Sequence, residues 1–185
     1  MTRLSARLAA VLLALALPAT TLATDYTVQP GSTLGFTGTF QGAAFHGSFK
    51  TWQATIRYDP AQLAQAKFDV TVQLASVAVR DKDQQAALPG ADFFDVARHP
   101  SARFVTTGLH AVGGKVVADG TLTLRGVSKP VRLAVTFTPN GNRATLDVSS
   151  VLKRLDFGVG RGDFADTSVI GADVTVQAHL LLQAR

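Results

Sequence analysis

The side chains that could carry out catalysis are few and poorly spaced for it. The chain of 185 residues has no cysteine, which excludes a thiolate nucleophile. No serine lies in a Gly-x-Ser-x-Gly turn of the hydrolase kind. No spacing typical of zinc ligands joins the four histidines, which are His46, His99, His110 and His179. We expect His46 and His179 on the polar faces of strands, in contact with solvent.

Asp92 and Asp95 are a pair of carboxylates with a spacing that suggests chemistry. Residues three apart lie on the same side of a helical turn, so Asp92, Asp95 and the nearby His99 are candidates for an acid and a base. The simpler interpretation is that Asp92 caps a short helix, and that Asp95 is a solvated charge paired with Arg98. The second interpretation is favoured, and no catalytic residue is predicted.

The basic residues do not form a nucleic-acid-binding surface. The formal net charge of +5 falls to +3 without Arg3 and Arg7, and all 13 acidic residues are aspartates. Scattered loop charges are typical of solvated positions and not of a basic stripe. Five of them are candidates to receive an anionic head group: Arg80, Lys82, Lys153, Arg154 and Arg161.

Apolar residues carry the stronger pattern. In residues 120–137, Leu122 and Leu124 alternate with polar residues, and so do Val131, Leu133, Val135 and Phe137 after a connection at residues 126–130. A period of two predicts strands with one apolar face. A lone hairpin cannot bury such a face, so further strands must share it.

The rest of the chain repeats this alternation. We expect strands near residues 26–29, 33–40, 68–74, 102–112, 144–148 and 172–182, and one long bent strand over residues 45–58. Gly113-Gly114 and Asn140-Gly141 predict tight hairpins. Helical turns are expected only at residues 61–66, 81–88 and 92–97. The predicted fold is all-β, a single antiparallel extended barrel of about eight strands with one short helical excursion.

The inward faces of these strands are rich in phenylalanine. Aromatic rings interleaved with glycines over residues 36–52 leave gaps between flat walls, which suits a long flexible apolar guest. The alternative is an ordinary packed core. The predicted ligand-binding residues are Phe36, Phe40, Phe45, Phe49, Trp52, Phe68, Phe94, Phe104, Leu122, Leu124, Val135 and Phe137.

The first residues have the composition of a secretory signal peptide. Arg3 and Arg7 precede an apolar run at residues 8–17 and a small-residue site near residue 23. The run is shorter than the roughly 20 residues of a bilayer span, which disfavours an uncleaved anchor. We therefore expect a signal peptide at residues 1–23 and a single domain at residues 24–185.

Two segments carry a resemblance to a known family. Residues 90–104, which include Ala-Asp-Phe-Phe-Asp, and residues 120–131, which read GTLTLRGVSKPV, resemble the signature regions of the YceI-like family. Residues 38–49 and Asp156-Phe157-Gly158 fit as well. The resemblance implies a periplasmic, lipocalin-like barrel that binds polyisoprenoid lipids such as isoprenoid quinones or prenyl pyrophosphates. The chain departs from the family at residues 84–88, where members often carry Arg-Asp-x-His-Leu.

Three functions follow as hypotheses. The first is a non-enzymatic carrier of an isoprenoid lipid, with no cofactor beyond that lipid. Similarity to members associated with b-type cytochromes favours a quinone guest and makes a membrane b-type cytochrome a candidate partner. The second is an enzyme acting on such a lipid, and the third is a packed barrel that docks on a membrane redox protein. The sequence leaves the oligomeric state open, with a dimer as one candidate.

Overall fold

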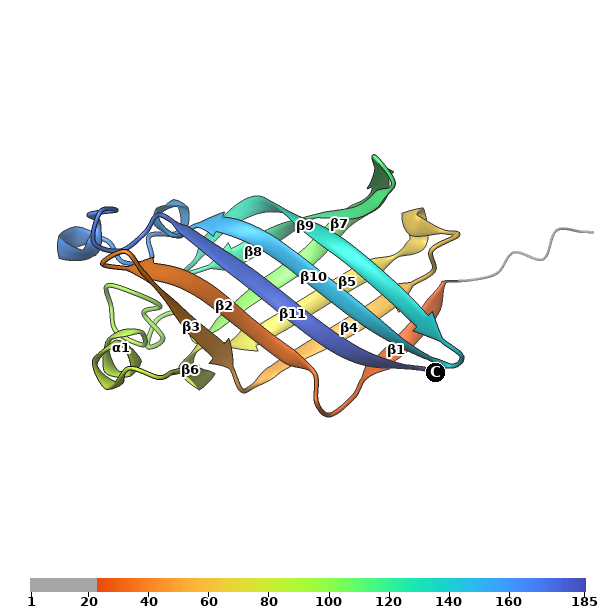
Figure 1. Ribbon diagram of the computed structural model, residues 1–185, viewed down its shortest axis with the longest axis horizontal. Coiled ribbons are helices and arrows are strands. Elements are labelled where there is room, and N and C mark those ends of the chain that lie inside the picture. Colours follow the sequence, from red (N-terminus) through yellow and green to blue (C-terminus); the bar gives the residue numbers. More distant parts are fainter. Residues whose placement is uncertain (1–22) are drawn as a thin grey trace, which may run out of the picture.

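A computed structural model describes residues 23–185, so the predicted signal peptide lies outside the described residues except for Ala23. The described chain is dominated by strands (Figure 1). The strands are β1 (Thr24–Val28), β2 (Thr33–Phe40), β3 (Ala43–Phe49), β4 (Trp52–Tyr58), β5 (Lys67–Gln73), β6 (Val77–Val79), β7 (Ser101–Val112), β8 (Lys115–Leu124), β9 (Val127–Asn140), β10 (Arg143–Lys153) and β11 (Asp173–Ala184).

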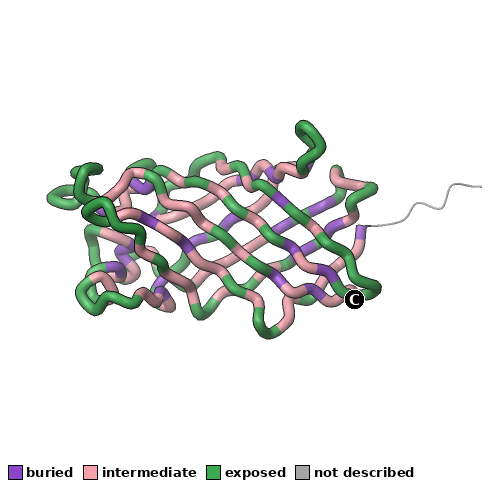
Figure 2. Tube along the Cα trace, viewed as in Figure 1, coloured by how far each residue is buried: buried purple, intermediate pink, exposed green. Residues whose placement is uncertain are grey.

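Eight of these strands close into an antiparallel barrel. Their order is β1-β4-β5-β7-β8-β9-β10-β11, and the pairing of β1 with β11 joins the two ends of the sheet. Tyr26 lies opposite Ala184 on one side of β1 and opposite Ile56 on the other. This confirms the predicted closed barrel of about eight strands. Figure 2 shows buried and exposed residues alternating along the strands, as a period of two requires.

The remaining strands lengthen one end of the barrel. β1 pairs with the last residues of β11, whereas β2 pairs with residues 175–179 of the same strand. β3 pairs with β2, and β6 then pairs with β3. The prediction of one long bent strand over residues 45–58 is wrong, because the chain bends between Phe49 and Trp52 and forms two strands, β3 and β4, that pair with different neighbours.

Tight turns set the register of the long strands. The hairpins at Gly113-Gly114 and Asn140-Gly141 are confirmed. The expected connection at residues 126–130 is wrong, because Leu124 pairs with Val127 and the turn is only Arg125-Gly126. Both turn residues have positive φ, 52° and 74°, the geometry that matches strand twist in a two-residue hairpin.

Helices are short, and α1 and the turns of residues 154–164 lie at one end of the molecule, whereas η1 lies at the other (Figure 1). α1 (Lys82–Ala87) is capped by the Asp81 side chain, which accepts a 2.9 Å hydrogen bond from the Gln84 amide, and η1 (Leu63–Gln65) forms the expected helical turn. The helix expected at residues 92–97 is wrong. Asp95 adopts a left-handed φ of 52°, which turns this segment into a series of tight turns. None of the helices in the described part of the chain is long and apolar enough to cross a membrane.

Candidate functional site: an apolar cavity in the barrel

The barrel encloses a cavity of about 230 Å³. Every barrel strand except β1 contributes inward side chains, at alternate positions such as Leu122 and Leu124 on β8 or Val174 and Val176 on β11. The walls are almost entirely hydrocarbon. A cavity needs only about 10–15 Å³ to hold one water molecule, so this one is large enough for several. A cavity lined by Leu, Ile and Phe nevertheless stays dry and takes up apolar molecules.

Strand glycines keep the aromatic rings flat against the wall. A Cβ on Gly47 would lie 2.2 Å from the Phe36 ring, and one on Gly38 would lie 2.6 Å from the Phe45 ring. In both cases the glycine and the ring are direct partners across β2 and β3. Because no side chain occupies the glycine position, the ring covers the neighbouring backbone and leaves the lumen free.

One end of the barrel is filled. We call this the closed end; it carries β1 and the hairpins at residues 113–114 and 141–142. Phe137 packs against Tyr58 and Tyr26, with ring centroids 4.5 Å and 5.7 Å away. Leu182 is 1% exposed within the same cluster. Burial raises the pKa of Tyr58, because the phenolate is disfavoured away from water. None of these side chains lines the cavity.

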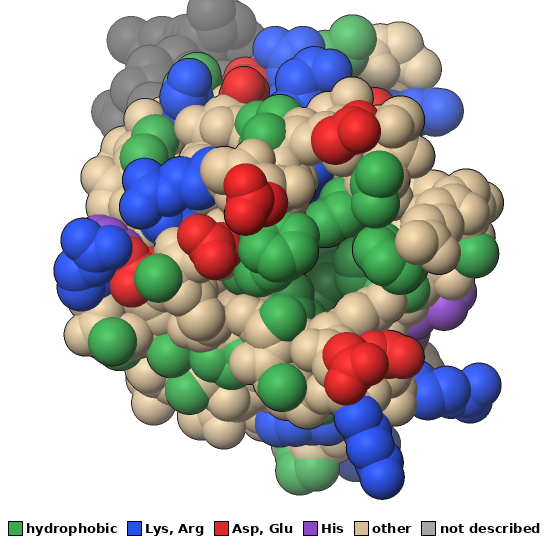
Figure 3. All heavy atoms as spheres, turned by 90° about the vertical axis from the view of Figure 1, so that its left-hand side faces the viewer, with side chains coloured by type: hydrophobic (Ala, Val, Ile, Leu, Met, Phe, Trp, Pro, Cys, Tyr) green, Lys and Arg blue, Asp and Glu red, His purple; other side chains and the backbone are tan. Residues whose placement is uncertain are grey.

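The opposite end is hollow. We call it the open end; it carries α1, residues 88–100 and residues 154–172. Figure 3 views this end directly and shows a hollow lined by hydrophobic side chains with acidic side chains around it. We call residues 88–100 the first loop and residues 154–172 the second loop. Leu88, Phe93 and Phe94 line the cavity from the first loop, and Val159 and Ile170 line it from the second.

The first loop is held by two polar devices. Gln85 of α1 covers the free edge of β6, accepting a 2.9 Å hydrogen bond from the Val79 amide and donating one of 2.9 Å to the Val77 carbonyl. The buried Arg125 donates through Nη1 to the carbonyls of Ala91 and Phe93. The Gln85 amide therefore pairs with the edge of β6 as a neighbouring strand would. The Arg125 guanidinium fixes the first loop to the β8–β9 turn.

The second loop is organised by Arg154, which is 5% exposed. Its guanidinium donates to four carbonyls: Gly171 (3.0 Å), Val159 (3.0 Å), Gly160 (2.5 Å) and Ile170 (2.8 Å). Burial lowers the pKa of Arg154. No salt bridge to Arg154 is found among residues 23–185. The side chain lines the cavity, but its donors are committed to the loop.

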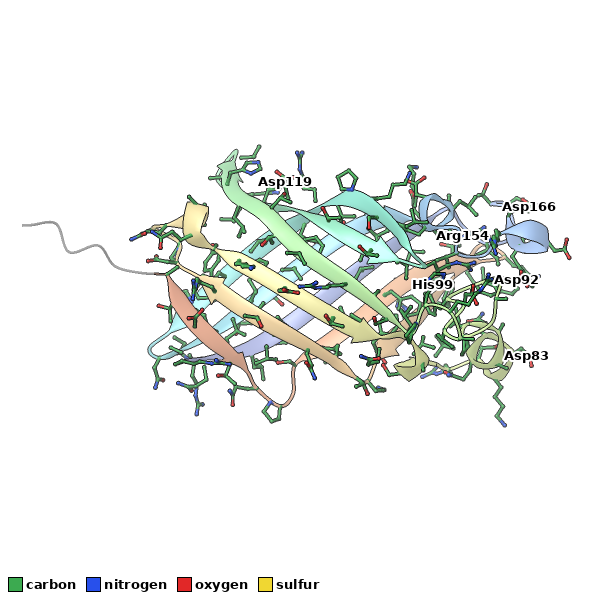
Figure 4. The ribbon with its side chains drawn as sticks, turned by 180° about the vertical axis from the view of Figure 1, so that it is seen from behind. Asp83, Asp92, His99, Asp119, Arg154 and Asp166 are labelled. Carbon is green, nitrogen blue, oxygen red and sulfur yellow. The ribbon has the colours of Figure 1, made fainter. Side chains whose placement is uncertain are left out.

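The candidate acid and base residues lie in different environments. Asp95 is 5% exposed and pairs with Arg98 at 2.8 Å, so it is not the solvated charge expected from the sequence. Asp92 is exposed and accepts a 2.7 Å hydrogen bond from Gly160 through its carbonyl, not through a capping carboxylate. His99 lies 2.9 Å from the point where a Cβ on Gly126 would stand. Figure 4 shows Asp92 and His99 at the open end.

The other histidines lie on the outer wall. His46 and His179 are exposed, as predicted. His46 shares a 2.9 Å hydrogen bond with Thr37, and His179 lies 2.6 Å from Asp147. Within residues 23–185, no group of three His, Asp or Glu side chains is close enough to hold a metal ion. Four of the basic candidates, Arg80, Lys82, Lys153 and Arg161, are absent from the cavity wall.

Nine of the twelve predicted ligand-binding residues line the cavity: Phe36, Phe45, Phe49, Trp52, Phe68, Phe94, Phe104, Leu122 and Leu124. The structure places three elsewhere. Val135 and Phe137 point inward but pack in the closed end, and Phe40 is 37% exposed where β2 leaves the barrel. Contact of the nine wall residues with a guest stays a prediction.

Several wall residues were not among the predicted ones. The same alternation on β4, β5 and β11 brings in Ala54, Ile56, Val70, Val174 and Val176. Their period of two was a usable signal, since they share the inward face with the predicted residues. Val159 and Ile170 had no such signal, because they lie in a loop whose path depends on Arg154.

Comparison with known proteins identifies relatives of this barrel. The model of the YceI-like domain matches residues 26–182. A UPF0312 protein of Pseudomonas syringae pv. tomato is 32% identical over 139 residues, which are 71% of this chain and 72% of that protein. The crystal structure of BcnA from Burkholderia cenocepacia is 32% identical, with a TM-score of 0.80 over 84% of this chain and 99% of that one.

A more distant structure has the same fold. The polyisoprenoid binding domain from Saccharophagus degradans, implicated in plant cell wall breakdown, is 18% identical, with a TM-score of 0.64 over 89% of this chain and all of that one. The match of the family model covers nearly all of the described residues, and the Pseudomonas protein is 32% identical over more than two thirds of the chain. The chain belongs to the YceI-like family.

Proposed function

We propose that the protein is a non-enzymatic carrier that holds a long isoprenoid lipid in the barrel cavity, with an isoprenoid quinone as the favoured guest and a prenyl pyrophosphate as the alternative. The observation that carries the proposal is the dry apolar cavity, closed at one end and open at the other. A blind apolar tube suits a hydrocarbon chain that enters tail first. The Saccharophagus barrel, described as a polyisoprenoid binding domain, is related in fold only.

The energetics favour a hydrocarbon guest. Burying about ten prenyl carbons at ~0.8 kcal/mol each yields ~8 kcal/mol, which corresponds to micromolar affinity before ordering costs. No charge inside the cavity is needed for such binding. Arg154 lines the cavity, but its donors are taken by four carbonyls. The head group is therefore proposed to stay at the open end.

The proposed site of action is the periplasm, reached through a cleaved signal peptide at residues 1–23. A membrane b-type cytochrome remains the candidate protein partner. Neither competing function gains support from a specific feature: Asp95 is neutralised by Arg98, and the lumen is not filled along its length. Catalysis by Asp92, Asp95 or His99 would require turnover of a prenyl substrate that disappears in the Asn and Gln variants.

The test is to identify what the protein carries. Protein purified without detergent is analysed by native mass spectrometry, and its organic extract is analysed for long-chain lipids. Trp52, the single tryptophan, lines the cavity, so its fluorescence should be quenched on addition of a prenyl quinone. A protein that arrives without a lipid and gives no saturable change in Trp52 fluorescence would falsify the proposal.

A further inference from the structure

Exposed large hydrophobic residues are distributed unequally between the two ends of the barrel. Of the seven in the described part of the chain, six lie at or close to the open end, and Val112 lies in the hairpin of the closed end. The six are Phe40, Val127, Val151, Leu155, Phe164 and Val169. Single exposed hydrophobics need no explanation, but their concentration at one end does.

Three of these exposed residues, from two segments of the open end, adjoin residues of the cavity wall. The Phe164 ring is 40% exposed and packs on Phe93, with ring centroids 4.9 Å apart, and Phe93 lines the cavity. Phe40 forms a β-bridge with Ile170, which also lines the cavity. Val169, 41% exposed, lies beside Phe40, because its carbonyl accepts a 2.7 Å hydrogen bond from the Gln41 amide. A path of hydrocarbon therefore leads from the outer surface into the lumen.

The charges around this surface do not select an anionic partner. Residues 80–100 carry three basic and four acidic side chains, and so do residues 153–173. Figure 3 shows acidic side chains closest to the hollow and basic ones farther out. Figure 4 shows Asp83, Asp92 and Asp166 at this end. A basic patch, which would favour anionic lipids, is not formed there.

We propose that the open end docks on the surface of a lipid bilayer through Phe40, Phe164 and Val169, and that this contact is driven by apolar burial and does not require anionic lipids. The inference rests on the proposed function, because a guest dissolved in a membrane reaches the cavity through this end. Aromatic and aliphatic side chains inserted at the level of the head groups bind in proportion to the apolar area that they bury.

The test is flotation of the full chain with phosphatidylcholine vesicles that contain no isoprenoid. The native protein should float with the vesicles, and the double variant Phe40→Ser/Phe164→Ser should lose at least tenfold in partitioning. Val112→Ser is the matched control and should float like the native protein, since Val112 lies at the closed end. Residues 1–22 are identical in all variants, so any binding through them is common to all.

The salt dependence of partitioning and a milder variant that keeps the native melting temperature provide two further readouts. Raising sodium chloride from 50 to 500 mM should change partitioning less than twofold. The milder Val169→Ser variant, whose side chain lies in an exposed loop, should lose about threefold and should melt at the native temperature. Equal flotation of the double variant, no flotation of the native protein, or flotation only with phosphatidylglycerol at low salt would overturn the proposal.

Loading without a membrane separates this inference from the proposed function. A prenyl quinone added from ethanol should quench Trp52 in the native protein and in the Phe40→Ser/Phe164→Ser variant alike. Loss of flotation with intact quenching is the expected result. Quenching without any flotation of the native protein overturns the docking alone, whereas flotation without quenching overturns the proposed guest and leaves the docking intact.

Discussion

The closed and open ends of this barrel are built from the same alternation and reach opposite results. At the closed end, Tyr26, Tyr58 and Phe137 pack ring against ring and fill the lumen. At the open end, Phe36 and Phe45 lie over glycines of the neighbouring strand, and the centre stays empty. The number of inward residues is not what differs. Rings contact rings at both ends, because Phe36 also packs against Phe45 and Phe49, with ring centroids 6.2 Å and 5.5 Å away. The difference is that Phe36 and Phe45 also cover strand glycines, which keeps these rings against the wall and leaves the centre free.

Truncation of a side chain at the closed end should have the largest effect on stability. Leu182→Ala leaves a void in a packed cluster, because Leu182 is 1% exposed, and should lower the free energy of unfolding by about 3 kcal/mol. Leu122→Ala, on the cavity wall, borders space that is already empty and should cost about 1 kcal/mol. Urea denaturation measures both. Equal losses would show that the open end is as well packed as the closed end.

Removal of the Arg154 guanidinium tests how the open end is maintained. Arg154→Met keeps the apolar stem but leaves four carbonyls without their donor, so stability should fall by about 2 kcal/mol. Amide exchange should rise mainly in residues 158–171. The neighbouring Lys153→Met is the control, since its side chain is 68% exposed and its pair with Asp173 contributes little. A variant with unchanged loop exchange would contradict the assigned role.

A methyl group at position 47 should narrow the cavity. In Gly47→Ala the Phe36 ring must leave the wall, because the new Cβ would lie 2.2 Å from it, and the lumen is the free direction. Guest affinity should fall about tenfold, or ~1.4 kcal/mol, in a Trp52 quenching titration. The added substitution Phe36→Leu should restore part of the affinity. If Gly47→Ala binds as well as the native protein, the glycine does not set the width of the cavity.

The edge of β6 should respond to loss of Gln85 with a smaller, local effect. Gln85→Leu removes the amide that pairs with Val77 and Val79, and we expect a loss of about 1 kcal/mol. Hydrogen exchange at the Val79 amide should accelerate, whereas exchange in β9 and β10 should stay unchanged. The neighbouring Gln84→Leu is a suitable control, because the Gln84 backbone amide, not its side chain, makes the capping bond. Protection at Val79 that survives Gln85→Leu would refute the edge cap.

The smallest expected effect on stability is that of acid on the pair of Asp69 and Arg103, which lies on the outer wall between the two ends. Hydrogen bonds from Arg103 hold the pKa of Asp69 below its usual value, against the opposing effect of burial. The folded carboxyl group therefore binds a proton less readily than the unfolded one. The stabilisation is complete above the usual pKa of about 4 and is lost as the pH falls through the lower folded value.

Comparison with Asp69→Asn isolates this contribution. The difference in melting temperature between the native protein and Asp69→Asn should be largest near pH 6 and should shrink below pH 4. A difference that stays constant between pH 6 and pH 3 would mean that the pair of Asp69 with Arg103 does not titrate with folding.

The sequence by itself determined the strands, their inward faces and the closed barrel, because a period of two in apolar residues depends only on local geometry. It also identified part of the apolar wall, since nine of the predicted residues line the cavity, seven of them aromatic. The tertiary structure decided the rest. Phe137 fills the lumen because Tyr58, from a strand far away in the sequence, packs against it. Phe36 leaves the lumen open because its partner on the neighbouring strand is Gly47. The paths of residues 88–100 and 154–172 depend on Arg125 and Arg154, whose partners are backbone carbonyls and therefore have no sequence pattern.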